Sequence, residues 1–199
     1  QKARSRPANV FKIIPHYFKQ RPLRIAYWIT MSRSMFWVTL FIYGPIYVIE
    51  ARLPTWVAGG LLSLASGLLL ISPLIRRFAG RVGTRLTIIY ALVLIGSSML
   101  MLYFIGEPKL IGLVFWVSAA LGGVTLDVLG NIPFMRMVKP RERIEMTMIF
   151  STWREGSQLL TPLLASLVLL FAPFEIFYVL LALFLFGAAI KASYLPRRL

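Results

Sequence analysis

Six long apolar runs separated by short polar connections constrain the fold of this chain more than any other feature. Each run is close to the roughly 20 residues that an α-helix needs to cross about 30 Å of hydrocarbon. Of the 199 residues, 58% are hydrophobic and only 15% are charged, which excludes an ordinary soluble domain. We therefore expect an all-α integral membrane protein with six transmembrane helices, at residues 25–49, 56–75, 86–105, 110–135, 144–171 and 174–194.

The basic residues predict the orientation of these helices. The net charge of +15 comes from short Lys and Arg clusters between the apolar runs, a pattern typical of membrane topology and not of nucleic-acid binding. Most clusters fall in the amino-terminal segment, the second and fourth connections and the carboxy-terminal end. The opposite side holds only Arg52 and Lys109. We expect a multi-pass protein of a bacterial inner membrane with both termini in the cytoplasm.

Residues 1–24 are expected to form a basic cytoplasmic arm that precedes a membrane domain at 25–199. Apolar residues between positions 10 and 18 lie among the basic residues of the arm, which predicts a short amphipathic helix at the lipid headgroups. The arm contains the chain's single histidine, His16, which we expect at the surface. The absence of cysteine excludes disulfides and thiolate metal sites, and we expect neither a metal nor a cofactor. Because the sequence starts with Gln1, we also expect it to be part of a longer chain.

Four ionisable residues lie inside the apolar runs: Arg33, Asp127, Arg154 and Glu155. A single charge at the middle of a spanning helix costs about 2.5 to 3.5 kcal/mol on insertion scales, so these groups must be paired or solvated. Three of them lie nine to eleven residues from the nearest cytoplasmic charge. This spacing corresponds to a depth of about 13 to 17 Å, near the bilayer centre. We expect the charges to form one layer that faces protein or a water-filled cavity.

Polar and aromatic residues one helical turn away extend this layer, since positions i and i+4 share a helix face. The candidate substrate-binding or proton-coupling residues are Arg33, Trp37, Asp127, Asn131, Arg154, Glu155 and Gln158. Two interpretations remain open. The charges either form ion pairs that only hold helices together, such as Arg33 with Asp127 or Arg154 with Glu155 or Asp127, or they contact a solute or carry a proton.

Small residues at four-residue spacing predict where helices pack closely. They are Gly59, Ser63 and Gly67 on the second run and Ala119 and Gly123 on the fourth.

The second connection, RRFAGRVGTR at 76–85, is similar to the cytoplasmic loop motif of the major facilitator superfamily. Arg81, Gly83 and Arg85 match its later positions, whereas Arg76 and Gly80 replace the leading glycine and the acidic residue. With its topology, the chain resembles the carboxy-terminal half, helices seven to twelve, of such a transporter. The resemblance implies two inverted three-helix repeats, a separate amino-terminal six-helix half as partner, and a solute site near the midplane. The arm would be the end of the link between the halves.

The leading functional hypothesis is a secondary transporter, a symporter or antiporter that works by alternating access and is coupled to protons. Its two buried arginines favour a small anionic or zwitterionic solute. The alternative is a non-transporting membrane scaffold or assembly factor whose charge layer is structural. An intramembrane enzyme is not expected, because the only histidine is in the arm and no GxSG serine motif is present.

Overall fold

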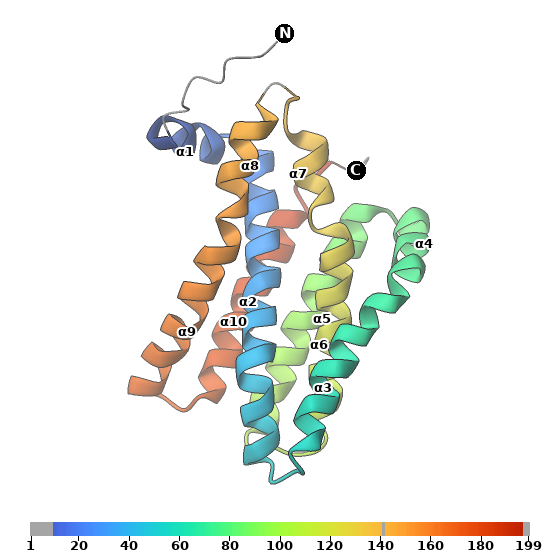
Figure 1. The fold of residues 1–199 in the computed structure, drawn as a ribbon, viewed down its shortest axis with the longest axis vertical. Helices are drawn as coiled ribbons and strands as arrows, with labels where there is room; N and C mark the ends of the chain where they lie inside the picture. The colour runs from blue at the N-terminus through green and yellow to red at the C-terminus, as the bar shows by residue number, and fades with distance from the viewer. Residues whose placement is uncertain (1–9, 141, 197–199) are drawn as a thin grey trace.

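The computed structural model describes residues 10–140 and 142–196, with side chains described from residue 14 onward. Six basic residues counted toward the predicted topology lie outside the described part, namely Lys2, Arg4, Arg6, Arg141, Arg197 and Arg198. The regular elements in the described part are all helical (Figure 1). They are α1 (Val10–Lys19), α2 (Arg21–Glu50), α3 (Trp56–Gly67), the 3-10 turn η1 (Leu68–Ile71), α4 (Ser72–Val82), α5 (Thr84–Ile105), α6 (Gly112–Leu129), α7 (Ile132–Met137), α8 (Arg143–Ser151), α9 (Trp153–Phe171) and α10 (Glu175–Ala192).

Five helical segments of the described chain are long and apolar enough to cross a membrane. They are Arg21–Glu50, Trp56–Val82, Thr84–Ile105, Gly112–Met137 and Glu175–Ala192. The protein is therefore a helical, multi-pass membrane protein. Two of these segments contain a break, one at η1 between α3 and α4 and one between α6 and α7. Pro73 and Pro133 stand in the first turn after these breaks, where a missing N–H leaves no hydrogen bond unmade.

The predicted run 144–171 is not among the five segments, although α9 with its 19 residues is long enough to be one. The structure also divides this run into α8 and α9. The helix is interrupted at Thr152, whose hydroxyl donates to the carbonyl of Ile149 at 2.7 Å. Arg154, Glu155 and Gln158 follow in the first two turns of α9 and lower its mean hydropathy. The expected single helix is thus interrupted at Thr152, and the polar residues that follow explain why α9 is less apolar than the five segments.

Helix α2 lies at the centre of the bundle and contacts α3, α6, α7, α9 and α10 (Figure 1). Helix α5 packs between α6 and α10. The core between these helices is apolar, and its largest fully buried side chains include Phe36, Leu92, Ile95, Trp116 and Phe177. Helix α9 packs mainly on α2, and most of its leucines are exposed, as lipid contact would require.

The predicted packing of small residues is found on the fourth run and not on the second. Ala119 is fully buried, and a Cβ on Gly123 would lie 2.6 Å from the ring of Phe36. Gly59 and Gly67, in contrast, have no atom within 4 Å of the place where a Cβ would stand. Helix α3 buries Leu61 and Ala65 instead, so its small-residue stripe faces away from the rest of this chain.

The arm helix α1 packs onto the basic end of the bundle, against α2 and α8. Tyr17 is fully buried there, and its hydroxyl donates to the carbonyl of Leu23 at 3.0 Å. Burial, with a smaller contribution from neighbouring Tyr27, raises the pKa of the Tyr17 phenol. The exposed His16 lies 3.6 Å from the carboxylate of Glu142, just before α8. Helix α1 is therefore attached to the membrane domain at the point where α8 begins.

Candidate functional site

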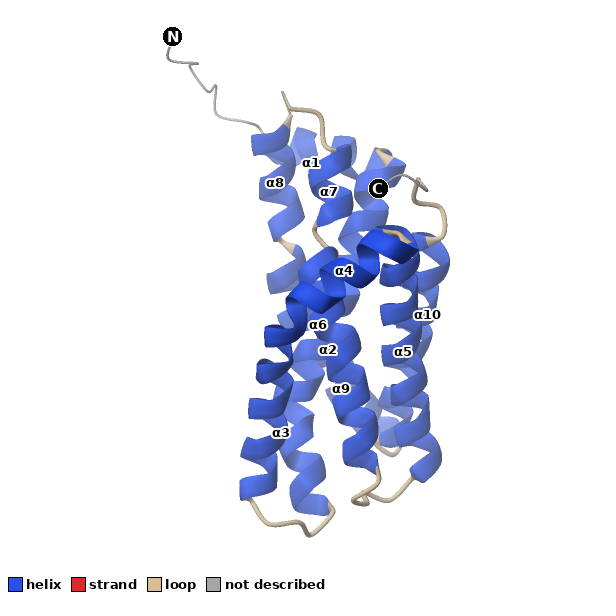
Figure 2. Ribbon diagram, turned by 90° about the vertical axis from the view of Figure 1, so that its right-hand side faces the viewer, coloured by secondary structure: helices blue, strands red, loops and turns tan. Residues whose placement is uncertain are grey.

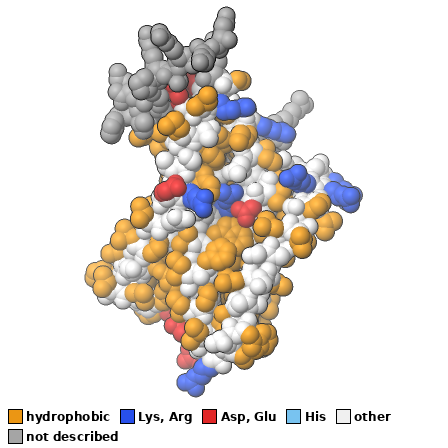
Figure 3. All heavy atoms as spheres, in the orientation of Figure 1, with side chains coloured by type: hydrophobic (Ala, Val, Ile, Leu, Met, Phe, Trp, Pro, Cys, Tyr) orange, Lys and Arg blue, Asp and Glu red, His pale blue; other side chains and the backbone are white. Residues whose placement is uncertain are grey.

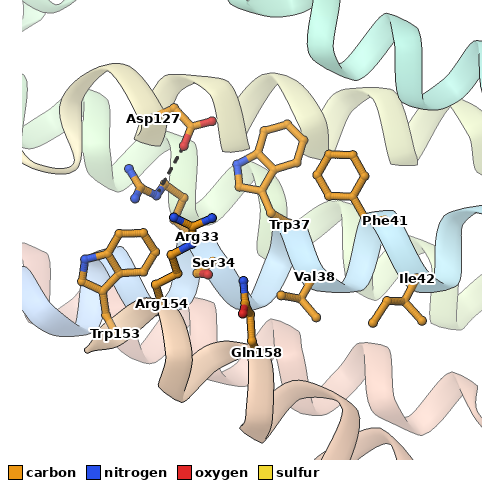
Figure 4. Close-up of a pocket in the computed structure, with 10 residues that line it drawn as sticks. All are labelled: Arg33, Ser34, Trp37, Val38, Phe41, Ile42, Asp127, Trp153, Arg154 and Gln158. Carbon is orange, nitrogen blue, oxygen red and sulfur yellow. Dashed lines mark ion pairs between the residues drawn. The ribbon is translucent and has the colours of Figure 1, made fainter. Parts of the chain in front are cut away.

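A cavity of about 490 Å³ lies between the middle of α2, the end of α6 and the start of α9. Its volume falls within the roughly 300 to 1,000 Å³ of pockets that enclose small ligands. Figure 3 shows acidic and basic side chains gathered across the middle of an otherwise largely apolar face. The cavity is lined by Arg33, Ser34, Trp37, Val38, Phe41, Ile42, Asp127, Trp153, Arg154 and Gln158 (Figure 4).

Arg33 is the most enclosed charge in the cavity, with 6% of the residue exposed. Its Nε lies 3.3 Å from Oδ1 of Asp127, and a terminal nitrogen donates to the carbonyl of Leu126 at 3.4 Å. The guanidinium also lies over the ring of Trp153, 4.7 Å from the centroid. Arg33 is thus held by a carboxylate, a carbonyl and an aromatic face, which together compensate for its removal from water.

The Leu126 carbonyl near the end of α6 is shared between Arg33 and Gly130. The backbone N–H of Gly130 bonds to the Leu126 carbonyl at 2.7 Å, and the carbonyl's second lone pair accepts from Arg33. A Cβ on Gly130 would lie 2.5 Å from the same oxygen. A side chain at this position would therefore crowd the carbonyl that binds Arg33.

A pair of buried serines sets the rotation of α9 against α2. The hydroxyls of Ser34 and Ser157 lie 2.5 Å apart, and both residues are buried. Ser157 stands between Arg154 and Gln158 in the first turns of α9. With Ser157 turned toward α2, Arg154 and Gln158 reach the cavity (Figure 4).

The structure brings five of the seven predicted residues to the cavity: Arg33, Trp37, Asp127, Arg154 and Gln158. Glu155 and Asn131 are exposed and do not line it. Glu155 points elsewhere because successive residues are about 100° apart around a helix. Asn131 lies beyond the end of α6, at the break before α7. Of the ion pairs considered from the sequence, only that between Arg33 and Asp127 forms within residues 10–140 and 142–196.

Arg154 consequently gives the cavity a positive charge that no carboxylate of the described residues neutralises. Its side chain is exposed and reaches the same space as the neutralised Arg33–Asp127 pair (Figure 4). Such a cation is free to bind an anionic group of a ligand.

Trp37 adds a hydrogen-bond donor at the other side of Asp127. Its indole N–H is buried and meets no strict hydrogen-bond geometry with a described residue, but it lies close enough to the Asp127 carboxylate to interact with it. Trp37 and Asp127 also line a smaller recess of about 260 Å³, which Phe41, Ser66 and Leu69 complete.

The apolar wall of the cavity was not among the predicted site residues. It consists of Val38, Phe41 and Ile42, which follow Ser34 at the four-, seven- and eight-residue spacing of one helix face. The sequence shows this spacing, so the three residues of the apolar wall could have been predicted from it. No pattern in the sequence predicts the stacking of Trp153 on Arg33, because this contact depends on how α9 packs against α2.

The loop-motif residues lie away from the cavity, between α4 and α5. Gly83 has a φ of 99°, a conformation that favours glycine. Arg85 donates to the carbonyls of Ser193 at 3.3 Å and Leu195 at 3.0 Å, beyond the end of α10. Arg81 is exposed in the last turn of α4. Arg85 therefore ties α5 to α10, where the carbonyls at a helix end need donors.

Comparison with protein-family models, with curated proteins and with solved structures finds no match for this chain. Within residues 10–140 and 142–196, no group of three or more His, Asp or Glu side chains could hold a metal ion. The geometry of the cavity is thus the basis for a functional assignment.

Proposed function

We propose that this chain is the carboxy-terminal half of a proton-coupled secondary transporter of the major facilitator type. The observation that carries this proposal is the cavity in which Arg154 is unneutralised beside the Arg33–Asp127 ion pair. Counting residues along the helices predicts that these charges lie near the bilayer centre. Charges inside spanning segments usually mark the path of a solute or ion.

The solute that fits this cavity is small and carries an anionic or zwitterionic group as well as an apolar part. Arg154 and Gln158 supply a cation and an amide at one end. Val38, Phe41 and Ile42 supply an apolar wall at the other. This combination of few polar groups with an apolar lining is typical of sites for small molecules.

Coupling to protons would operate through the Arg33–Asp127 pair. A proton on Asp127 removes the carboxylate charge that neutralises Arg33, and Arg33 then binds an anionic group of the solute. Loss of that proton restores the ion pair at 3.3 Å, which competes with the solute for the same guanidinium. Proton and solute would therefore bind together and leave together.

A second six-helix unit would cover the face that carries the cavity. Arg154 and Glu155 are both exposed at the start of α9, in the run 144–171 that the sequence assigns to the membrane. Each would cost about 2.5 to 3.5 kcal/mol if it faced lipid, so a protein or water-filled space must lie against them. The inverted three-helix repeats, the cytoplasmic termini and the bacterial inner membrane belong to this proposal.

Reconstitution of the native full-length protein in liposomes with an imposed pH gradient tests this function. The assay measures uptake and efflux of a panel of small carboxylates and zwitterions. We expect Asp127→Asn to abolish accumulation driven by the gradient, and Arg154→Gln to raise the solute concentration needed for half-maximal rate. The matched controls are Glu107→Gln and Arg136→Gln, which change the same charges on exposed residues away from the cavity.

The non-transporting scaffold is favoured by one specific observation, that Arg33 already has partners in Asp127, Leu126 and Trp153. If folded Asp127→Asn and Arg154→Gln variants transport the solutes as the native protein does, or no solute of the panel is moved, the transporter assignment is wrong. The charge layer is then structural.

A further inference from the structure

A second cavity, which shares no lining residue with the charged site, lies between α4, α5 and α6. Its volume is about 290 Å³, at the lower end of the roughly 300 to 1,000 Å³ that small-molecule sites occupy. The cavity, which we call the α4 groove, is lined by Leu74, Ile75, Phe78, Thr87, Tyr90, Ala91, Leu94, Leu121 and Thr125.

The α4 groove exists because α4 runs at an angle to α3 (Figure 2). The 3-10 turn η1 and Pro73 interrupt the helix between them. Helix α4 then buries only Ile75 and Ala79 against the bundle. Leu74 and Phe78 remain 61% and 50% exposed at the mouth of the groove.

The walls of the groove offer little to a polar ligand. The hydroxyl of Thr87 donates to the carbonyl of Gly83 at 3.0 Å, and that of Thr125 donates to the carbonyl of Leu121 at 2.8 Å. Both hydroxyls are therefore satisfied within their own helices, and Tyr90 is the remaining polar side chain of the lining. An apolar chain suits this groove better than a solute with charged groups.

Two arginines of α4 stand next to the lining residues of the groove: Arg77 directly precedes Phe78, and Arg81 lies toward the end of the helix. Arg77 and Arg81 are exposed, and neither forms an ion pair with a described residue. Arg81 comes three residues after Phe78 and seven after Leu74, on the same helix face. At 1.5 Å per residue it stands about 5 Å and about 10 Å beyond them along the axis. The sequence contains no acidic residue between Glu50 and Glu107, so nothing in this stretch opposes the arginines.

We propose that the α4 groove binds one anionic phospholipid, with an acyl chain between Leu74 and Phe78 and the headgroup phosphate at Arg77 and Arg81. An apolar groove with two unpaired guanidinium groups on the helix that forms its wall matches the acyl chain and the phosphate of such a lipid. Anionic lipids attract Lys and Arg next to a membrane span, and a groove adds the shape that selects a single molecule.

Native mass spectrometry of the full chain, released from vesicles of equimolar phosphatidylglycerol and phosphatidylcholine, tests this site. We expect one retained phosphatidylglycerol, in clear preference to phosphatidylcholine. Arg77→Gln and Arg81→Gln should each lower that preference about fivefold. Arg77→Lys with Arg81→Lys should keep most of it, because the positive charge remains. Leu121→Trp, which fills the groove without changing charge, should also remove the retained lipid.

Arg136→Gln with Lys139→Gln is the matched control, because both are exposed basic residues outside the groove. Far-ultraviolet circular dichroism verifies that each variant is folded. The site does not exist if the control loses the lipid as the Arg77 and Arg81 variants do, or if folded Leu121→Trp retains it. Competition by glycerol 3-phosphate alone, at concentrations that displace phosphatidylglycerol, would also overturn the proposal, because it would show a phosphate site without a lipid site.

Discussion

Replacement of Asp127 by Asn separates the two members of the buried ion pair. At 3.3 Å and an effective dielectric constant of about 20, the two charges attract by about 5 kcal/mol before desolvation is subtracted. Removal of one partner from a buried pair costs about 3 to 5 kcal/mol. In Asp127→Asn the carbonyl of Leu126 and the ring of Trp153 still hold Arg33, which reduces the expected loss of unfolding free energy to about 2 to 3 kcal/mol.

The opposite replacement, Arg33→Met, should cost less. The side chain of Asp127 is 29% exposed, against 8% for Arg33, so water reaches the carboxylate that remains. We expect a loss of about 1 kcal/mol, since a partly hydrated charge carries a smaller penalty. The double variant removes both charges and should lose less than Asp127→Asn alone.

Equilibrium unfolding in mixed detergent micelles, followed by far-ultraviolet circular dichroism, measures these differences. Glu107→Gln, on an exposed residue between α5 and α6, is the control and should change the unfolding free energy by less than about 0.5 kcal/mol. If Asp127→Asn costs less than Arg33→Met, or if the double variant costs their sum, the pair is not a coupled, unequally buried ion pair and the reasoning is refuted.

Three further predictions concern packing and helix ends. Gly122→Ala should destabilise the bundle by about 1 to 3 kcal/mol, because its Cβ would lie 2.9 Å from a backbone oxygen of α5, whereas Gly59→Ala, with no atom within 4 Å, should be neutral or stabilising in the same unfolding assay. Tyr17→Phe removes the hydroxyl that donates to Leu23 and should cost about 1 kcal/mol, with faster hydrogen exchange in α1 and equal exchange in α5 as the check. Arg85→Gln leaves two carbonyls after α10 without their donor, and we expect hydrogen exchange to increase in the last turn of that helix while α9 is unchanged.

The charge layer could be predicted because depth in a membrane helix follows from counting residues. Each residue adds 1.5 Å along the axis, so the separations of Arg33, Asp127 and Arg154 from the nearest basic clusters fixed their levels. The structure places all three around one cavity. Counting residues did not predict which charges form ion pairs. Arg33 pairs with Asp127, whereas Arg154 has no carboxylate partner among the described residues.

The arrangement of α8 and α9 was predicted less well, for a physical reason. The run 144–171 has the length of a spanning helix, and a hydropathy pattern does not reveal a break. The break at Thr152 depends on a local side-chain bond to Ile149 and on a cross-helix contact between Thr152 and Tyr27 at 3.2 Å. Side-chain bonds of Ser and Thr to nearby carbonyls compete with the helical hydrogen bonds, but they do not always break a helix, as Ser157 shows by bonding to the Arg154 carbonyl within α9.

The sequence by itself determined that this protein is helical, crosses a membrane several times and carries charges at one depth. These properties depend on apolar length and on the helix rise, which are local. Only the tertiary structure decided which charges pair, which face of α3 is buried and where α9 points. Those depend on contacts between residues far apart in the chain, such as Ser34 and Ser157, whose separation is 123 residues. A helix can rotate about its axis without changing its own hydrogen bonds, so its rotation is set only by the neighbours it packs against.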